Sequence, residues 1–301
     1  MQRRTFLLGA SAFATLACAS APAPGTTAGS SVGRYTSSPW SFSTASYWIE
    51  GPGGVVVIDT QFLASEARAV IDAVRRATGK QVVAAVVLHA NPDKFNGTAT
   101  FTRHGARVLT SASVRDQIPA VHAQRLAAFG ERYAPDFPLA PAQPEVFGHA
   151  TTTLELAGLS LRAHVLGPGC GRSHVALQWR DHVFVGDLVA SGAHAWMELG
   201  LLDEWLTRLD ELEAMAPAHV HPGRGPSGGP ELIAMQRVYL RDVSERVQRV
   251  AKAGPPGEHA ARQLVAEITA AYPTHRFPVF LEVAMPALLR RATDTARRGA
   301  A

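Results

Sequence analysis

The chain has 301 residues, of which 47% are hydrophobic and 18% are charged. This length and composition suffice for one large hydrophobic core with a small appended part, and they exclude a chain that is disordered throughout. The formal net charge is only +4 and the basic residues form no stripe, so the sequence predicts no nucleic-acid-binding surface.

Residues 1–24 have the pattern of an export signal of the twin-arginine type. Arg3 and Arg4 are followed by an apolar run over residues 8–17, and then by small residues and prolines. The apolar run is too short to cross a bilayer as a mature helix. We therefore expect an exported, periplasmic protein. An ordinary secretory signal with two arginines is the alternative.

Cys18 leaves two outcomes open. As a lipid-attachment cysteine it would make the protein a membrane-anchored lipoprotein, although Thr15 stands where such signals usually have leucine. Otherwise cleavage after Ala21 or Ala23 removes it. This lipid anchor is the only membrane contact that the sequence predicts. In either case Cys170 is the sole cysteine of the folded part, so no intramolecular disulfide is expected there.

The folded part is expected to begin after a flexible linker. Residues 25–38 are rich in Gly, Ser and Thr, which is typical of a tether. Two strands over 46–50 and 55–59 follow, separated by a Gly/Pro turn. Apolar residues at helical spacing then predict a helix from Leu63 that ends at Gly79. The uninterrupted apolar run over 82–88 predicts a strand buried on both faces.

The second half of the chain repeats this mixture of strands and helices. A helix over about 113–128 leads into an irregular, Pro-rich stretch. Asp203 is predicted to cap a helix with Trp205 and Leu209 on its inner face. From Pro230 onward the chain is predicted to be mostly helical. The expected strands of this half cover residues 152–156, 161–166, 175–179, 183–185 and 218–221.

This order of elements predicts two β-rich halves, packed as sheets with helices outside. The polar residues capable of chemistry stand directly after strand ends, where layered α/β proteins build their sites. They lie at 89–93, 170, 187 and 221–224.

Four of these segments, in this order, resemble motifs of the metallo-β-lactamase superfamily. The stretch from His89 to Gly97 resembles the His-x-His-x-Asp-His-x-x-Gly loop, and Gly167 to Cys170 resembles Gly-Pro-Gly-His. Gly186-Asp187 resembles the Gly-Asp that follows a strand, and Pro222 to Pro226 resembles Pro-Gly-His-Gly-Pro. The resemblance covers roughly residues 40–230.

The resemblance implies an α/β fold, the αββα metallo-β-lactamase sandwich, over residues 39–230. A helical C-terminal extension is expected over residues 231–301. The extension is expected to pack against the sandwich and to border the entrance of its site. Asp59, after a strand, matches an early Asp that supports the site in the superfamily.

Four of the seven positions that bind two metal ions in the superfamily carry a different residue here. His89, Asp93 and Asp187 are retained, whereas Asn91, Lys94, Cys170 and Arg224 stand where histidine is expected. Lysine and arginine are hydrogen-bond donors, and arginine does not act as a metal ligand.

At the second metal position we expect Lys94 and Arg224 to replace the ion and to pair with Asp93 and Asp187. The first position leaves two alternatives open. In the first, His89, Cys170 and Asp187 would hold one zinc ion, and Asn91 and Asp93 complete the candidate metal set. Alternatively, no metal binds. His174 and His221 are expected to form hydrogen bonds near the ligands without binding the metal themselves.

The first functional hypothesis is a metal-dependent hydrolase of an ester, lactone or amide with an anionic group. Asp93 and Asp187 are its candidate catalytic residues, and Lys94 and Arg224 would bind the anionic group of the substrate. The second is a metal-free, non-catalytic protein that binds a small anion or a protein partner. A third uses Cys170 as a redox or nucleophilic thiol, activated by nearby cations such as Arg172.

Overall fold

The computed structural model of the protein describes residues 32–254 and 257–299. The predicted export signal, with Cys18 and its cleavage sites, lies outside the described residues. Within the described ranges, no helix is both long enough and apolar enough to cross a membrane.

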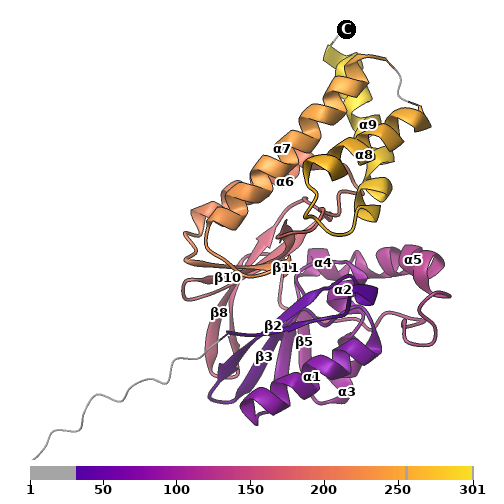
Figure 1. The fold of residues 1–301 in the computed structure, drawn as a ribbon. Helices are drawn as coiled ribbons and strands as arrows, with labels where there is room; N and C mark the ends of the chain where they lie inside the picture. Colours follow the sequence, from indigo (N-terminus) through magenta and orange to yellow (C-terminus); the bar gives the residue numbers. More distant parts are fainter. Residues whose placement is uncertain (1–31, 255–256, 300–301) are drawn as a thin grey trace, which may run out of the picture.

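Two sheets form the centre of the molecule (Figure 1). The first has six strands in the order of the chain, β1-β2-β3-β4-β5-β6, and the second has five strands in the order β11-β10-β9-β8-β7. The first sheet consists of β1 (Val32–Thr36), β2 (Ala45–Gly51), β3 (Gly54–Ile58), β4 (Val82–Val86), β5 (Arg107–Thr110) and β6 (Glu145–Val146). The second consists of β7 (Thr152–Leu156), β8 (Leu159–Leu166), β9 (His174–Trp179), β10 (His182–Ala190) and β11 (His219–Arg224).

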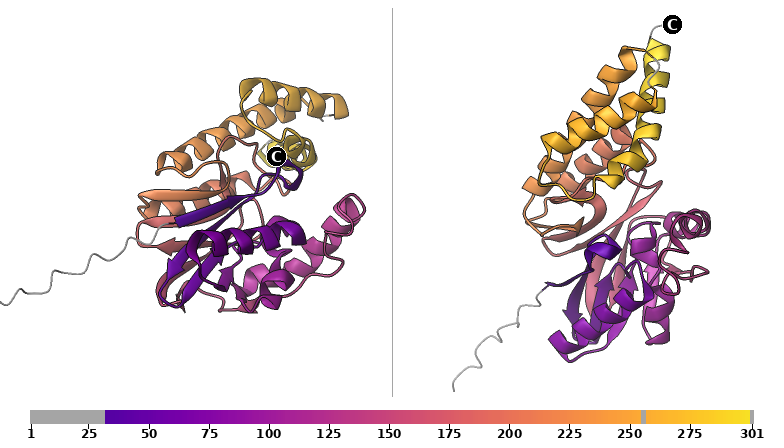
Figure 2. Two further views of the ribbon diagram at one scale, coloured as in Figure 1. Left: turned by 60° about the horizontal axis from the view of Figure 1, so that its bottom comes forward. Right: turned by 45° about the vertical axis from the view of Figure 1, so that its right-hand side comes forward.

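Helices cover the outer face of each sheet, which gives four layers (Figures 1 and 2). On the first sheet these are α1 (Ala64–Thr78) and α3 (Thr98–Arg103), with the short α2 (Pro92–Phe95), α4 (Ala112–Arg115) and α5 (Ile118–Phe129) at its edge. On the second sheet they are α6 (Leu202–Ala214) and α7 (Glu231–Lys252), on which α8 (Glu258–Ala271) and α9 (Val279–Gly299) pack. The α/β fold is therefore the predicted αββα sandwich with a helical C-terminal part.

Apolar side chains of the two sheets meet in one core. Val57 and Val86 of the first sheet share a cluster of buried residues with Leu161 and Leu177 of the second. The β4 strand lies between β3 and β5 and pairs with both in parallel. Because both of its faces are covered, its sequence is an apolar run rather than an alternation, as predicted.

The C-terminal helices extend the second layer rather than forming a core of their own. Leu240 of α7, Ile268 of α8 and Leu281 of α9 lie in one buried cluster with Val185 and Val220 of the second sheet. This packing confirms that the C-terminal part docks on the sandwich. It brings the start of α9 toward the strand ends that carry the candidate site residues.

The prediction of a flexible linker over 25–38 is wrong for residues 32–36. Val32–Thr36 form β1, which pairs antiparallel with β2. The Gly that suggested a tether has a packing reason, because a Cβ on Gly33 would lie 1.9 Å from the Trp48 ring. A small residue is needed there for the indole to cover the strand.

Two further expectations are corrected by the structure. Asp203 does not cap its helix, because α6 begins after Leu201 and Asp203 lies in its first turn. There its negative charge still favours the helix N-terminus. The short strands β5 and β6, which complete the first sheet, were not predicted. The inner face of α6 is as expected, with Trp205 and Leu209 fully buried.

Candidate functional site

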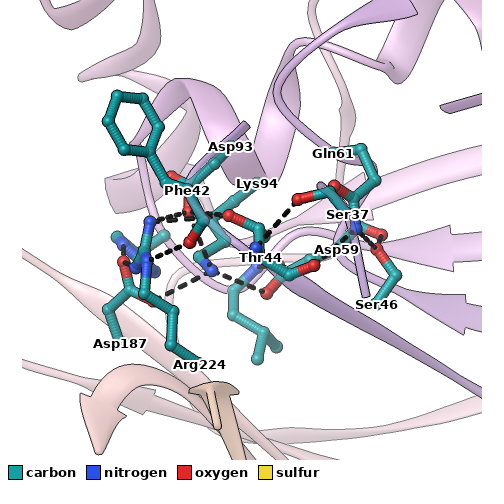
Figure 3. A network of polar contacts seen from close by, with 12 residues as sticks. Ser37, Phe42, Thr44, Ser46, Asp59, Gln61, Asp93, Lys94, Asp187 and Arg224 are labelled. Carbon is teal, nitrogen blue, oxygen red and sulfur yellow. Dashed lines mark hydrogen bonds and ion pairs between the residues drawn. The ribbon is translucent and has the colours of Figure 1, made fainter. Parts of the chain in front are cut away.

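The polar residues predicted to follow strand ends meet between the two sheets, although Asp187 lies within β10 and Arg224 is the last residue of β11. His89 follows β4, and Asp93 and Lys94 lie on the one-turn helix α2 directly after it. From the second sheet, Asp187 lies in β10 and Arg224 ends β11. All five side chains are buried. Figure 3 shows how Asp93, Lys94, Asp187 and Arg224 point toward one another.

The Lys94 ammonium lies at the centre of three carboxylates. Nζ is 2.9 Å from Asp187 Oδ1, 3.1 Å from Asp93 Oδ2 and 3.9 Å from Asp59 Oδ2 (Figure 3). The Lys94 side chain is 0% exposed. A buried ammonium is tolerated only where carboxylates compensate for the lost hydration, so this position is built for a cation.

Arg224 bridges the same two carboxylates from the opposite side. Its Nη2 donates to Asp93 Oδ2 at 2.7 Å, and its Nη1 pairs with Asp187 Oδ2 at 2.6 Å. Its Nε donates to the carbonyl oxygen of Phe42 at 3.2 Å, and Thr44 Oγ1 donates to Asp93 Oδ2 at 3.0 Å. The predicted pairing of Lys94 and Arg224 with Asp93 and Asp187 is therefore present. We call these four residues the ion cluster.

Electrostatics keeps the ion cluster charged. Burial alone would raise the pKa of Asp187, but Arg224 and Lys94 outweigh it and hold that pKa well below its usual value. The pKa of Asp93 is lowered in the same way, since Lys94 and Arg224 outweigh burial. Burial also opposes the charged forms of Lys94 and Arg224, yet the two carboxylates raise both pKa values.

Asp59 supports the cluster from behind, as the resemblance implies. It has a left-handed backbone conformation (φ 63°), which Asp tolerates better than most residues. Its Oδ1 accepts a hydrogen bond from the Leu88 backbone N–H at 2.9 Å, which ties β3 to the end of β4. Burial raises the pKa of Asp59 to about 7 although Lys94 opposes the shift.

His89, Cys170 and His174 form a second group beside the ion cluster. His89 Nε2 lies 3.6 Å from Asp187 Oδ2, and neither ring nitrogen of His89 has a hydrogen-bond partner among the described residues. Burial alone would lower the pKa of His89, but Cys170 and Asp187 outweigh it and raise that pKa to about 10. The Cys170 sulfur lies 3.9 Å from His174 Nε2, which also accepts the Gly171 backbone N–H at 3.1 Å.

Cys170 does not have the environment of an activated thiol. It is a free, buried cysteine, and burial raises its pKa although His89 opposes the shift. Thiolate character, on which nucleophilic and redox reactivity depend, is therefore disfavoured. Burial therefore opposes the activation of Cys170 by neighbouring cations, and the rate of Cys170 alkylation at neutral pH would test that hypothesis.

Asn91 and His221 lie away from the centre of the site. Asn91 precedes α2 and lines a small pocket together with Asp93 and Arg224. The His221 ring faces the other side of β11, where Nε2 is 2.9 Å from His182 Nδ1 and Nδ1 is 2.8 Å from Ser227 Oγ. His221 therefore supports the strand that ends in Arg224 without contacting the ion cluster.

The donor set does not fit two metal ions. Lys94 and Arg224 already pair with both carboxylates that would hold a second ion. Within residues 32–254 and 257–299, no three His, Cys, Asp or Glu side chains are placed to hold a metal together. His89 with Cys170 and Asp187 is the set that comes nearest, although both oxygens of Asp187 already face a cation.

The pocket above the ion cluster is small and aromatic. Its volume is about 20 Å³, room for about one water molecule. Asn91, Asp93 and Arg224 belong to its lining, and the Arg224 guanidinium lies 5.2 Å from the centre of the Phe280 ring. The other lining residues are Phe42, Phe62, Pro92, Arg125, Phe129 and Trp196.

Sequence reasoning missed the residues of this pocket. Phe42 and Phe280 are far apart in the chain, yet their rings lie 5.7 Å apart over the site. The Phe42 backbone is left-handed (φ 61°), which is unusual for a large side chain, and this directs its carbonyl to Arg224. No motif or periodicity marked either residue. Phe280 does confirm that the C-terminal part borders the site.

The chain belongs to the metallo-β-lactamase superfamily, whose sequence pattern matches residues 40–224. No curated protein matches the sequence. Among solved structures, a metallo-beta-lactamase from Pontibacter korlensis has a TM-score of 0.52 and 21% identity, over 66% of this chain and 87% of its own.

Two further structures give the same result. The metallo-beta-lactamase FIM-1 from Pseudomonas aeruginosa, in its mono-zinc form, has a TM-score of 0.52 and 18% identity, over 70% of this chain and 89% of its own. The metallo-beta-lactamase from Erythrobacter litoralis has a TM-score of 0.50 and 13% identity, over 66% of this chain and 85% of its own. At these identities the likeness shows the fold and does not transfer an activity.

Gly223 is required by its contact with the ion cluster. A Cβ at this position would lie 2.1 Å from Asp187 Oδ1 and 2.8 Å from the Gly186 carbonyl carbon. We expect Gly223→Ala to displace the carboxylate and to lower the free energy of unfolding by about 1–3 kcal/mol. Urea unfolding would measure this. Gly53→Ala is the control, because its Cβ makes only ordinary contacts from 3.4 Å outward. Equal effects would contradict the role given to Gly223.

His221 makes the stability depend on pH. Burial lowers the pKa of His221 to about 3, so the folded chain holds it neutral. Because its unfolded pKa is near 6.5, this contribution to stability is complete above about pH 6.5 and is lost as the pH falls toward 3. The loss approaches about 1.4 kcal/mol per pH unit.

Thermal unfolding between pH 7.5 and 4.5 tests this contribution. We expect His221→Asn to flatten the acid slope, whereas replacement of the exposed His149 leaves the slope unchanged. An unchanged slope in His221→Asn would assign the acid sensitivity to other groups.

Proposed function

We propose that this chain is a metal-independent binding protein on the metallo-β-lactamase fold. One observation carries the proposal. The Lys94 ammonium lies 2.9 Å from Asp187 and 3.1 Å from Asp93, between the carboxylates that the superfamily motif offers to a metal ion. A divalent ion at this position would displace the ammonium or meet its repulsion at close range in a desolvated site.

The ligand is proposed to enter at the aromatic pocket above Arg224. The aromatic walls offer stacking and apolar contact, and Asn91, Asp93 and Arg224 offer polar groups. Apolar walls with a few fixed polar groups are typical of small-molecule sites. A volume of about 20 Å³ holds no such ligand, so binding requires side chains of the wall to move.

The two cations contribute unequally to this site. Lys94 is 0% exposed and faces three carboxylates, so an incoming anion does not reach it. Arg224 lines the pocket, although Asp93 and Asp187 already neutralise its charge. Of the two cations predicted to bind the anionic group of a small ligand, only Arg224 is therefore within reach of a ligand in the pocket.

Elemental analysis of the purified, tag-free protein tests the proposal. We expect no stoichiometric zinc, iron or manganese, even after refolding in the presence of zinc. Cys170→Ala is the control for adventitious binding to the thiol. About one metal ion per chain, lost in His89→Ala as well as in Cys170→Ala, would overturn metal independence and support the second candidate function.

That second candidate is a hydrolase with a single metal ion. It is favoured by the two unpartnered ring nitrogens of buried His89, which lie beside Cys170 and Asp187. These three residues would hold the ion, and zinc would supply a water of lowered pKa. Asp93 and Asp187 would be the catalytic carboxylates. Esters, lactones and amides with an anionic group are the substrates to screen.

Export to the periplasm is part of the proposed function. It rests on the arginine pair and the apolar run in residues 1–24. The mass of the exported protein would distinguish cleavage after Ala21 or Ala23 from lipid attachment at Cys18. A full-length mass in the cytoplasm would contradict export.

A further inference from the structure

Beside the aromatic pocket, the chain binds one of its own carboxylates. Glu198 lies in the segment between β10 and α6, and the side chains of Arg125, Gln124 and Trp196 surround it. Arg125 Nη1 donates to Glu198 Oε1 at 2.9 Å and Nη2 donates to Oε2. Gln124 Nε2 donates to Oε1 at 3.0 Å, and Trp196 Nε1 donates to Oε2 at 3.2 Å.

This arrangement has the chemistry of a carboxylate receptor. The planar guanidinium of Arg125 binds both oxygens in parallel, and each oxygen receives one further donor. The guanidinium also stacks over the Trp196 ring, 4.9 Å from its centre. Stacking fixes the plane in which a carboxylate is accepted. Four donors on one side chain exceed what a surface ion pair requires.

The receptor opens onto the proposed ligand pocket. Arg125 and Trp196 line that pocket together with Arg224, and the Trp196 ring packs edge-on against Phe280 at 5.0 Å. The Arg125 side chain is 8% exposed, and its buried Nε has no hydrogen-bond partner among the described residues. Arg125 therefore has one N–H that Glu198 does not use.

We propose that Arg125, Gln124 and Trp196 form the carboxylate-binding subsite of the aromatic pocket, and that Glu198 occupies it in place of a ligand. The ligand class is a carboxylate carried on an aromatic or apolar body. When the ligand enters, Glu198 moves out and its carboxylate becomes hydrated, since its side chain is already 20% exposed. This inference rests on the proposed binding function and assigns the anionic group to Arg125 rather than to Lys94 and Arg224.

Removal of the internal carboxylate tests the subsite, with benzoate as the probe and benzamide as its neutral analogue. We expect Glu198→Ala to bind benzoate at least tenfold more tightly than the unaltered chain in calorimetric titration. Benzoate should also raise the melting temperature of Glu198→Ala, whereas benzamide should not. The added Arg125→Gln change should abolish both effects.

Two further variants keep the test decisive. Glu204→Ala is the matched control, because Glu204 also pairs with an arginine, Arg291, but neither residue lines the aromatic pocket. It should bind benzoate no better than the unaltered chain. If Glu198→Ala does not fold, Glu198→Gln replaces it, since the amide keeps one acceptor oxygen and loses the negative charge. Benzoate binding that Glu198→Ala or Glu198→Gln fails to improve overturns the subsite.

Failure of this inference and failure of the proposed function give different results. Stoichiometric metal in the unaltered chain overturns metal independence whatever the benzoate titrations show. If the chain is metal-free but the Glu198 variants bind benzoate no better than the unaltered chain, only the proposed carboxylate subsite is overturned.

Discussion

Replacement of Lys94 by alanine is expected to lower the free energy of unfolding by about 3–5 kcal/mol. The ammonium is 0% exposed and lies within 4 Å of Asp59, Asp93 and Asp187. Its removal leaves buried carboxylates that Arg224 alone must compensate. The cost therefore comes from uncompensated buried charge rather than from the loss of one favourable contact. Urea unfolding followed by circular dichroism measures it.

Lys80 provides the matched control for this prediction. Its ammonium also pairs with a carboxylate, Glu50, at 2.8 Å, but both side chains are 37% exposed. Lys80→Ala is expected to change the free energy of unfolding by no more than about 1 kcal/mol. If the two substitutions had equal effects, Lys94 would not be compensating buried carboxylates, and the ion cluster would lose its assigned role.

The ion cluster also explains how this fold holds its strand ends together. Asp93 and Lys94 come from the first half of the chain, and Asp187 and Arg224 come from the second. Each cation pairs with a carboxylate of both halves. In a metal site the ion makes this link between ligands from separate loops. Here the same link is made by side chains alone.

The sequence predicted the centre of the molecule well because its signals are local. The apolar run of β4 and the polar residues after each strand end are contiguous in the chain. A parallel strand brings the residues that follow it to one edge of its sheet. The family resemblance assigned Lys94 and Arg224 to the second metal position beside Asp93 and Asp187, and the charges of the four residues then predicted their pairing.

What could not be predicted depends on contacts between distant segments. Phe42 and Phe280 cover the site only because α9 packs on the second layer, and Arg125 and Glu198 meet from helix and loop. In neither pair are the two residues related by a sequence spacing from which their contact could be predicted. The β1 strand was not predicted because its segment has the Gly-rich composition of a linker. Gly33 is in fact needed for packing beside Trp48. Short strands such as β6, with two residues, carry too little pattern to detect.

Restoration of the four histidines that the superfamily motif expects should convert the ion cluster into a metal site. The variant combines Asn91→His, Lys94→His, Cys170→His and Arg224→His. We expect it to bind about two zinc ions per chain, because His89, Asp93 and Asp187 are already in place and the competing cations are gone. Bound zinc should raise its melting temperature, and a chelator should reverse the rise.

The same variant with Asp187→Asn added is the control, since it keeps the new histidines but lacks one of the two carboxylates that both cations now share. It should bind less zinc and bind it more weakly. A folded fourfold variant that binds no zinc would mean that the spacing of the strand ends, and not the chemistry of Lys94 and Arg224, keeps metal out. The ion cluster would then be a consequence of metal loss rather than its cause.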